Sequence, residues 1–232
     1  MSEVIRTVKR VVISLGGFYF DDAARIKRIA VALDELAESS CCGLYVVTGG
    51  GALARQCISI ARELGANEAV CDYIGIAITR VNARLLISAL RNAYPEPFYD
   101  YDEVAAARTA EERKIAVMGG VTPGYTTDAV SALLAEYINA DLLLNVTTVD
   151  GVYEADPRKY PGARKYDRIT PKELVGLTAR EELKAGSRII IDPFAAKIIE
   201  RSRIRTIVLD GNNPRDIIDA VVHGRHHGTE IG

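Results

Sequence analysis

The sequence has few residues of the kinds on which many catalytic sites depend. Its three histidines, His223, His226 and His227, all lie close to the C-terminal end. A site that uses histidine in the body of the chain is therefore excluded. The four cysteines form no CxxC pair and have no zinc-type spacing with histidine; they are Cys41, Cys42, Cys57 and Cys71. We expect reduced thiols, as is usual in the cytoplasm, with a disulfide only if the source is hyperthermophilic.

The familiar phosphate-binding signatures are missing as well. No GxxxxGK[ST] sequence is present, so the chain is not a P-loop enzyme, and no GxGxxG sequence opens a βαβ unit. The catalytic signatures of protein kinases are also absent. Any phosphate site in this chain must therefore use a different arrangement.

Long apolar segments and a strong net charge are absent too. The segment Met1–Arg10 is charged, and the apolar run after it ends at Gly16-Gly17, too soon for a signal peptide or a membrane span. With 29 basic and 31 acidic side chains, the formal net charge is −2. This balance gives no electrostatic reason to expect nucleic acid or an anionic membrane as a partner. We expect a cytoplasmic protein that binds neither.

Apolar runs of strand length alternate with helical patterns along most of the 232 residues. The predicted strands are Val11–Leu15, Leu44–Thr48, Ile115–Met118, Leu142–Thr147 and Arg205–Leu209. The predicted helices are Asp22–Glu38, Ala52–Leu64, Asp72–Asn92, Thr127–Ile138, one that begins at Asp192-Pro193, and Pro214–Val222. This alternation predicts one α/β domain with a largely parallel sheet and helices on both faces.

Three of the predicted strands run into glycines and then into a helix. The turns are Ser14–Gly17, Thr48–Gly51 and Gly119–Gly124. Glycine lets backbone N–H groups approach an anion closely, and the following helix adds unpaired N–H groups and a positive dipole end. Because the carboxyl ends of parallel strands meet at one edge of a sheet, the three turns together predict a phosphate site. Arg55, one turn into the helix after the second turn, either binds that phosphate or is an ordinary solvated arginine.

Five segments, taken in order, resemble the motifs of the uridylate (UMP) kinase family, archaeal type, within the amino-acid-kinase superfamily. These segments are Gly49–Arg55, Asp72–Gly75, Met118–Ala129, Val149–Pro157 and Ile191–Lys197. The resemblance implies a three-layer α/β/α sandwich around a mainly parallel sheet. It also implies transfer of the γ-phosphoryl group of MgATP to UMP, giving UDP, by a homohexamer built as a trimer of dimers. The Mg²⁺ ion would arrive with ATP, and the protein itself would hold no metal.

The resemblance also assigns site residues. The UMP side would lie in an N-terminal lobe (about 1–140) and would use Gly50, Asp72, Val121, Thr122, Pro123, Gly124, Tyr125, Thr126 and Thr127. The ATP side would extend into a C-terminal lobe (about 141–232) and would use Gly17, Phe18, Gly51, Arg55, Thr147, Tyr153 and Asp156. The residues nearest the reacting phosphates would be Arg55, Asp192 and Lys197.

Most of these residues also have an ordinary structural explanation. Asp72 is a candidate helix N-cap when it is considered without the family, and so are Thr126 and Thr127. Asp192 fits an N-cap as well as a place near the phosphates. Asp156 precedes a proline in a plausible turn, and a tyrosine such as Tyr153 in an apolar stretch is usually part of the core.

One departure from the superfamily concerns the first glycine turn. Many members carry a lysine beside it, whereas this chain reads Val12–Phe18 with no lysine. Arg55 is our candidate for the missing positive charge, with Lys197, Lys9 and Arg10 as weaker ones. Because an acceptor phosphate is already ionised, the transfer needs no general base. Two alternatives remain: another kinase of the superfamily, above all acetylglutamate kinase, or a nucleotide or oxyanion sensor without turnover.

Overall fold

The computed structural model describes residues 8–40, 42–107, 109–155, 160, 162–181 and 191–232. Within these residues one seven-stranded sheet has the order β3-β2-β1-β4-β6-β7-β5, and only the β6–β7 pair is antiparallel. The strands are β1 Arg10–Leu15, β2 Gly43–Thr48, β3 Ile115–Met118, β4 Leu142–Thr147, β5 Arg168–Ile169, β6 Thr206–Asp210 and β7 Thr229–Ile231.

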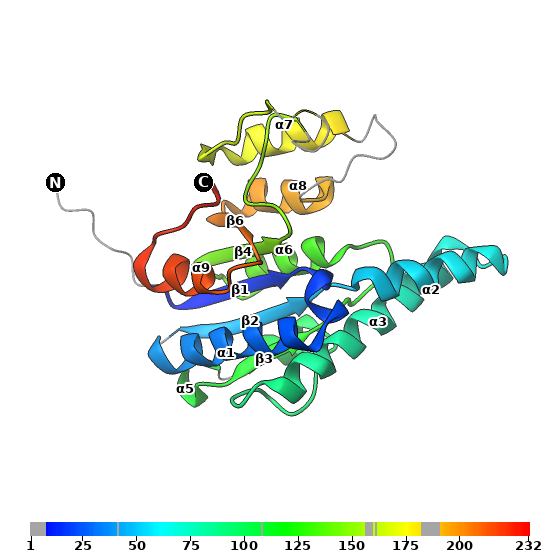
Figure 1. Cartoon of the computed structure of the whole chain (residues 1–232), viewed down its shortest axis with the longest axis horizontal. Coiled ribbons are helices and arrows are strands. Elements are labelled where there is room, and N and C mark those ends of the chain that lie inside the picture. The colour runs from blue at the N-terminus through cyan, green and yellow to red at the C-terminus, as the bar shows by residue number, and fades with distance from the viewer. Residues whose placement is uncertain (1–7, 41, 108, 156–159, 161, 182–190) are drawn as a thin grey trace.

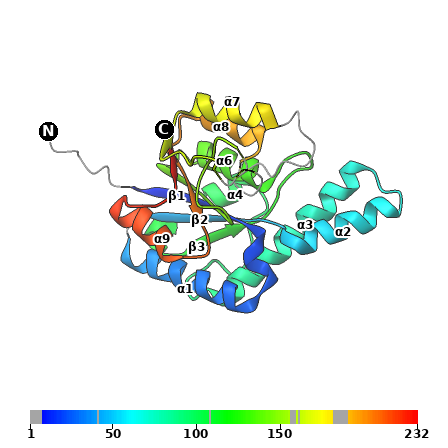
Figure 2. The same cartoon turned by 45° about the horizontal axis from the view of Figure 1, so that its top comes forward.

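Helices cover both faces of this sheet, which makes three layers (Figure 1 and Figure 2). One face packs against α1 Ala23–Ser39, α3 Glu68–Ala89 and α9 Arg215–Ile218, and the other against α6 Thr127–Tyr137, α7 Pro171–Glu181 and α8 Pro193–Ser202. The remaining elements are the 3₁₀ turn η1 Gly17–Asp21, α2 Gly51–Glu63, α4 Tyr101–Ala105, α5 Thr109–Glu112 and the π-helical turn η2 Asp219–His223. The expected three-layer α/β fold is confirmed.

The central strands are mostly apolar because both faces of the sheet are buried. In β1, Val11, Ile13 and Leu15 belong to the core on the α1 side, whereas Val12 belongs to the core on the α6 side. Such strands show no alternation of polar and apolar residues, so the sequence reveals them as short continuous apolar runs.

The predicted elements are present with small shifts of their ends. The largest shift is in α3, which begins at Glu68 because the Asn67 side chain accepts the Val70 N–H and caps the helix. Asp72 therefore lies inside α3, and its interpretation as an N-cap is wrong. The sequence pattern missed the short elements α4, α5, β5 and β7, which are too short to show a period. It also missed the longer α7.

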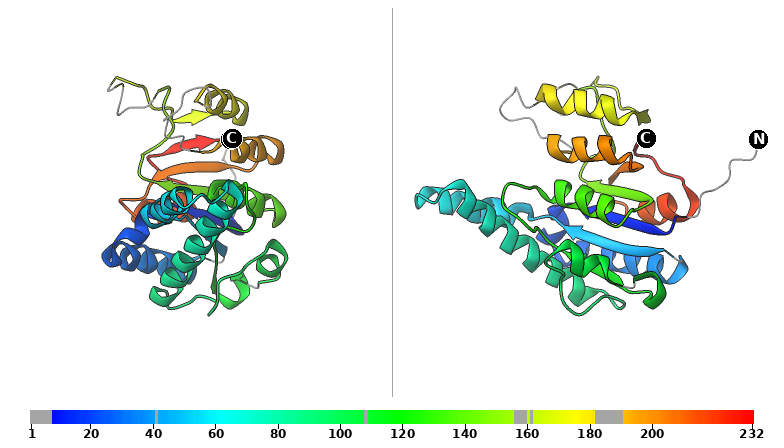
Figure 3. Two further views of the ribbon diagram at one scale, coloured as in Figure 1. Left: turned by 90° about the vertical axis from the view of Figure 1, so that its right-hand side faces the viewer. Right: turned by 180° about the vertical axis from the view of Figure 1, so that it is seen from behind.

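The order of the strands places a topological switch point between β1 and β4 at the carboxyl edge of the sheet. The chain moves outward from β1 through β2 to β3, then returns to place β4 on the other side of β1. Ligands of open α/β sheets bind at such a switch point, outside the carboxyl ends of the strands. At the same edge, α2 and the first half of α3 form an arm that projects beyond the sheet (Figure 1 and Figure 3).

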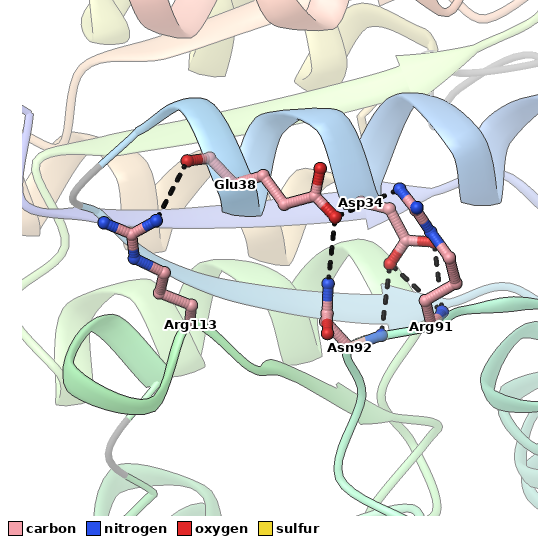
Figure 4. Close-up of polar contacts among 5 residues, drawn as sticks. All are labelled: Asp34, Glu38, Arg91, Asn92 and Arg113. Atoms are coloured by element: carbon pink, nitrogen blue, oxygen red, sulfur yellow. Dashed lines mark hydrogen bonds and ion pairs between the residues drawn. The ribbon is translucent and has the colours of Figure 1, made fainter.

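A polar cluster at the amino edge fastens the far end of α3 to α1 (Figure 4). Asp34 of α1 is only 2% exposed and accepts the backbone N–H groups of Arg91 and Asn92 at 3.0 and 3.2 Å. The Glu38 carboxylate accepts the Asn92 side-chain amide at 3.3 Å and pairs with the Arg91 guanidinium at 3.1 Å. The cluster thereby holds the C-terminal end of α3 against α1.

Candidate functional site

The first two glycine turns lie against each other at the ends of β1 and β2. A Cβ atom on Gly17 would collide with the backbone of Gly51, and one on Gly51 would collide with the carbonyl oxygen of Gly17. Gly51 also has a φ of +68°, which favours glycine over any residue with a side chain. Both positions therefore require glycine, and the contact brings two sets of backbone amides to one place.

The amides of these turns are available to an anion. Among the described residues, no hydrogen-bond acceptor is found for the N–H of Gly17 or of Gly50. Gly51 is the first residue of α2, where N–H groups have no intrahelical partner and the helix dipole is positive. The exposed Arg55 lies one turn further along α2 and has no hydrogen bond or ion pair within the described part of the chain. This arrangement suits a phosphate group.

The third turn joins β3 to α6 and contacts α3. The Asp72 carboxylate accepts the Gly124 N–H at 2.8 Å, so the predicted UMP residue on α3 is tied to the predicted UMP loop. Thr126 caps α6 by accepting the Ala129 N–H at 3.1 Å. Asp72 is half-buried and Gly124 is exposed. The contact leaves the second carboxylate oxygen of Asp72 as an acceptor for a ligand hydroxyl group.

The N-terminus of α8 meets this loop from the opposite side. Asp192 caps α8 by accepting the N–H groups of Phe194 and Ala195 at 2.8 and 3.1 Å, and it also accepts the hydroxyl group of Thr126. The rings of Tyr125 and Phe194 stack with their centroids 5.1 Å apart. Asp192 therefore combines a capping role with a place at the site. Lys197, by contrast, is exposed and has no hydrogen bond or ion pair with another described residue.

A half-buried carboxyl group beneath the site was missed by the sequence analysis. Asp128, in the first turn of α6, accepts the Ser14 hydroxyl at 3.1 Å and the Asn145 side-chain amide at 3.3 Å. Ser14 and Asn145 are paired neighbours on β1 and β4. Burial, and next the negative charge of Asp192, raise the pKa of Asp128 to about 7, against the opposing effect of the two hydrogen bonds. The available signal was a polar residue inside each of two apolar strands.

Several of the predicted ATP residues lie around the ends of β1, β4 and β6. The carbonyl oxygen of Thr147 accepts the Gly211 N–H at 2.7 Å, and the hydroxyl group of Tyr19 donates to the Gly211 carbonyl. The Phe18 ring packs against Gly211. Tyr153 is half-buried and donates its hydroxyl proton to Asp150 at 2.7 Å, so it is not a core residue. Asp156 lies outside the described residues.

The structure thus brings most of the predicted residues to one edge of the sheet. These residues lie around the switch point between β1 and β4: the glycine turns, Arg55, Asp72, the 121–127 loop and Asp192. Among the described residues, Lys197 makes no hydrogen bond or ion pair with any of them. No cluster of three or more His, Cys, Asp or Glu side chains that could hold a metal ion occurs within the described part of the chain. No helix among those residues is long and apolar enough to cross a membrane.

The fold and this edge define a class of protein that binds phosphates on strand-end glycine turns of an open α/β sheet. Within that class, the chain belongs to the amino acid kinase family, whose model matches residues 9–210.

Individual relatives narrow the class. The chain is 52% identical to the "Uridylate kinase" of Methanococcoides burtonii over 216 residues, which cover 91% of each protein. It is 50% identical to that of Halobacterium salinarum over 226 residues, 96% of this chain and 92% of the relative. The crystal structure of uridylate kinase from Archaeoglobus fulgidus matches 96% of this chain and 99% of that chain with a TM-score of 0.86 and 47% identity.

Proposed function

We propose that the protein is a UMP kinase, which transfers the γ-phosphoryl group of ATP to the phosphate of UMP and releases UDP and ADP. The observation that carries the proposal is the convergence of unpaired glycine amides and Arg55 between two regions that suit two nucleotides. Relatives named uridylate kinase at about half identity over nearly the whole chain support the same substrate. They do not favour acetylglutamate kinase or a sensor.

The proposal assigns the residues to two sides of the switch point between β1 and β4. On the UMP side, in a lobe of about residues 1–140, Asp72 accepts a ribose hydroxyl and the 121–127 loop encloses the base. On the ATP side, in a lobe of about residues 141–232, Thr147, Tyr153 and Asp156 surround the adenosine. Gly17, Phe18, Gly50 and Gly51 offer amides to the phosphates between them.

Phosphoryl transfer asks a protein for positioning and for positive charge where negative charge develops. In this site the donors are backbone amides, the N-terminus of α2 and the guanidinium group of Arg55. No side chain has to remove a proton from the acceptor, since the attacking phosphate oxygen of UMP is already ionised. The lack of a histidine at this edge is therefore compatible with the reaction.

Magnesium fits this site as an ion that arrives with ATP. Mg²⁺ keeps several waters and binds through one or two carboxylates together with substrate phosphates. Asp192 and Asp128 lie close enough for the charge of one to raise the pKa of the other, so this edge offers two carboxyl groups. When bound, the ion would neutralise part of the phosphate charge.

A coupled assay tests the proposal. Purified protein with MgATP is offered UMP, CMP, dUMP or acetylglutamate in turn, and ADP release is followed. We expect turnover that is fastest with UMP. Saturable UMP binding without UDP formation would favour a sensor instead, and turnover of acetylglutamate alone would contradict the choice of substrate.

We also propose that the chain assembles into a homohexamer, as its resemblance to UMP kinases implies. An exposed apolar stripe runs along the outer face of α3, which is the face turned away from the glycine turns; it consists of Val70, Tyr73, Ala77, Val81 and Leu85. Contiguous exposed apolar surface of this kind marks an interaction site. The small Ala77 lies near the middle, which allows two copies of α3 to cross closely in a self-complementary contact.

Light scattering after gel filtration measures this assembly. Val81→Glu is expected to lower the molar mass, because it buries an unpaired charge in the contact. Val31→Glu on α1 is the matched control, since Val31 is also exposed but lies outside the stripe. An unchanged mass for Val81→Glu would remove α3 from the interface.

We further propose that the enzyme works in the cytoplasm. Cys57 and Cys71 are free thiols, as is usual for cytoplasmic proteins.

A further inference from the structure

Helix α3 contacts both the second and the third glycine turn through polar side chains on one of its faces. Asn82 donates its amide to the carbonyl oxygens of Gly49 and Gly50 at 2.7 and 3.3 Å. One turn earlier, the hydroxyl of Thr79 accepts the Gly120 N–H at 2.7 Å. Both side chains are nearly inaccessible, with 2% and 5% exposed. They lie outside the sets of residues that the proposed function assigns.

The Asn82 contacts decide the direction in which the second turn presents its amides. The carbonyl of Gly49 shares a planar peptide unit with the N–H of Gly50, and the carbonyl of Gly50 shares one with the N–H of Gly51. In a trans peptide the C=O and N–H groups point in opposite directions. Because Asn82 holds both carbonyls toward α3, the two N–H groups point away from α3. They therefore face the side on which Gly17 and the first turn lie.

The Thr79 contacts tie the ends of β2 and β3 to the same helix. The Thr79 hydroxyl donates to the Ile76 carbonyl at 2.6 Å, which leaves its lone pairs aimed at the Gly120 N–H. The Thr79 carbonyl in turn accepts the hydroxyl of Thr48 at 2.8 Å, and Thr48 ends β2. A Cβ atom on Gly119 would lie 2.7 Å from the Thr79 hydroxyl oxygen, so the third turn rests directly on α3. The separation of the two turns is thereby set by one rigid element.

We propose that Asn82 and Thr79 are positioning residues of the phosphoryl transfer: Asn82 orients the amides of Gly50 and Gly51, and Thr79 places the acceptor loop relative to them. This inference rests on the proposed function, since it concerns the same site. It goes further because both residues are proposed to act through backbone groups of the glycine turns. Rigid support of this kind holds a site in its productive geometry.

The two residues have different expected kinetic effects. Asn82→Asp keeps the shape of the side chain, removes the donated protons and turns a carboxylate oxygen toward two carbonyls. We expect kcat to fall by about a hundredfold, the scale for losing a preorganised oxyanion donor, with a smaller change in KM. Thr79→Val keeps the shape but removes the hydroxyl group, so the Gly120 N–H loses its acceptor and the Ile76 carbonyl loses one donor. We expect KM for UMP to rise about tenfold, the scale of one hydrogen bond left unmade in a buried site, with a smaller change in kcat.

Two further variants separate positioning from loss of stability. Thr79→Ser retains the hydroxyl and should restore KM to nearly the wild-type value. Thr206→Val is the matched control, because Thr206 is fully buried and its hydroxyl donates to the Ile204 carbonyl at the opposite edge of the sheet. It should lower the melting temperature without changing KM or kcat. Thr79→Val and Thr206→Val with equal kinetics would overturn the inference, even if Asn82→Asp fails to fold.

Hydrogen exchange of the Gly120 amide provides a readout that does not depend on catalysis. Loss of its acceptor in Thr79→Val should raise its exchange rate, whereas Thr206→Val should leave it unchanged. If the wild-type protein shows no UMP kinase activity, the proposed function fails, and the exchange experiment still decides whether Thr79 holds the loop. An unchanged Gly120 exchange rate in Thr79→Val would overturn the inference by itself.

Discussion

The two edges of the sheet each hold an aspartate away from bulk water, and they surround these carboxyl groups in different ways. At the amino edge, Asp34 accepts two backbone N–H groups and lies beside the guanidinium group of Arg91 (Figure 4). At the carboxyl edge, Asp128 has only the neutral donors of Ser14 and Asn145, and its charged neighbour is a second carboxylate, Asp192.

The comparison suggests an amino edge that holds the fold together and a carboxyl edge that serves the proposed reaction. Asp34 joins α1 to the chain after α3 through two backbone N–H groups and the guanidinium group of Arg91. The surroundings of Asp128 instead disfavour its charge and raise its pKa to about 7. Strongly perturbed carboxyl groups cluster at functional sites, because such sites combine burial with like charges. The comparison predicts that substitutions at the amino edge change stability and those at the carboxyl edge change activity.

The largest expected effect is at the amino edge. Asp34→Ala leaves the buried N–H groups of Arg91 and Asn92 without acceptors, and we expect unfolding to become easier by about 3 kcal/mol. Denaturant titration measures the change. Glu38→Gln is the control, because it alters a carboxylate of the same cluster whose side chain is 50% exposed. The folded variant should retain its turnover number. A loss of turnover at unchanged stability would show that the amino edge also serves the site.

The next effect is at the carboxyl edge. Arg55→Ala removes a cation that has no partner in the described part of the chain, so stability should change little. We expect turnover to fall by about a hundredfold or more, as for the loss of one transition-state charge partner. Steady-state kinetics with MgATP and UMP measures it. Arg62→Ala on the same helix, where Arg62 pairs with Glu68, is the matched control, and unchanged turnover in Arg55→Ala would remove this residue from the mechanism.

The smallest expected effect is that of Asp128→Asn, which depends on pH and stabilises the fold, whereas Asp34→Ala destabilises it. The raised pKa of Asp128 means that the folded state binds the proton more tightly than the unfolded state, so stability falls as pH rises from about 4 to about 7. Asp128→Asn removes this cost. At pH 8 the variant should be more stable than wild type by on the order of 2 kcal/mol, less than the full shift implies because the side chain is partly accessible.

Denaturation midpoints at pH 8 and at pH 4 test this prediction. The gain should be present at pH 8 and mostly lost at pH 4, where Asp128 is protonated in the folded state and about half protonated in the unfolded state, given its ordinary pKa of 3.8. Asp102→Asn, at an exposed position of α4, is a control that keeps the same change of residue. A gain of equal size at both values of pH would show that the substitution acts through packing and that ionisation of Asp128 does not destabilise the fold.

Much of the architecture could be predicted from local patterns. The five predicted strands are present, because a buried parallel strand is a short apolar run whatever its neighbours are. Thr126 and Asp192 each cap a helix as their positions suggested, since capping involves residues only a few positions apart. Thr127 is the first residue of α6, so its interpretation as an N-cap is wrong. The edge strands β5 and β7 could not be predicted, because two or three residues carry no period.

The site was less predictable than the fold. The glycine turns could be identified, and so could Arg55 and Asp72 through the family resemblance. The start of α3 was placed at Asp72, although Asn67 caps it and Asp72 binds the Gly124 N–H. Asp128 lies in the segment Met118–Ala129, which was recognised as a family motif, but no role was assigned to it. Nothing in that segment reveals that Ser14 and Asn145 lie beside Asp128.

The amino-acid pattern alone was enough to decide the class of fold, and it predicted the glycine turns at the strand ends. Both follow from patterns among near neighbours along the chain. Which groups hold the glycine turns was decided only by tertiary packing, since the contacts of Asn82 with Gly49 and of Thr79 with Gly120 join residues 33 and 41 positions apart. A hydrogen bond across such a distance depends on how α3 lies against the sheet, and no local preference encodes that position.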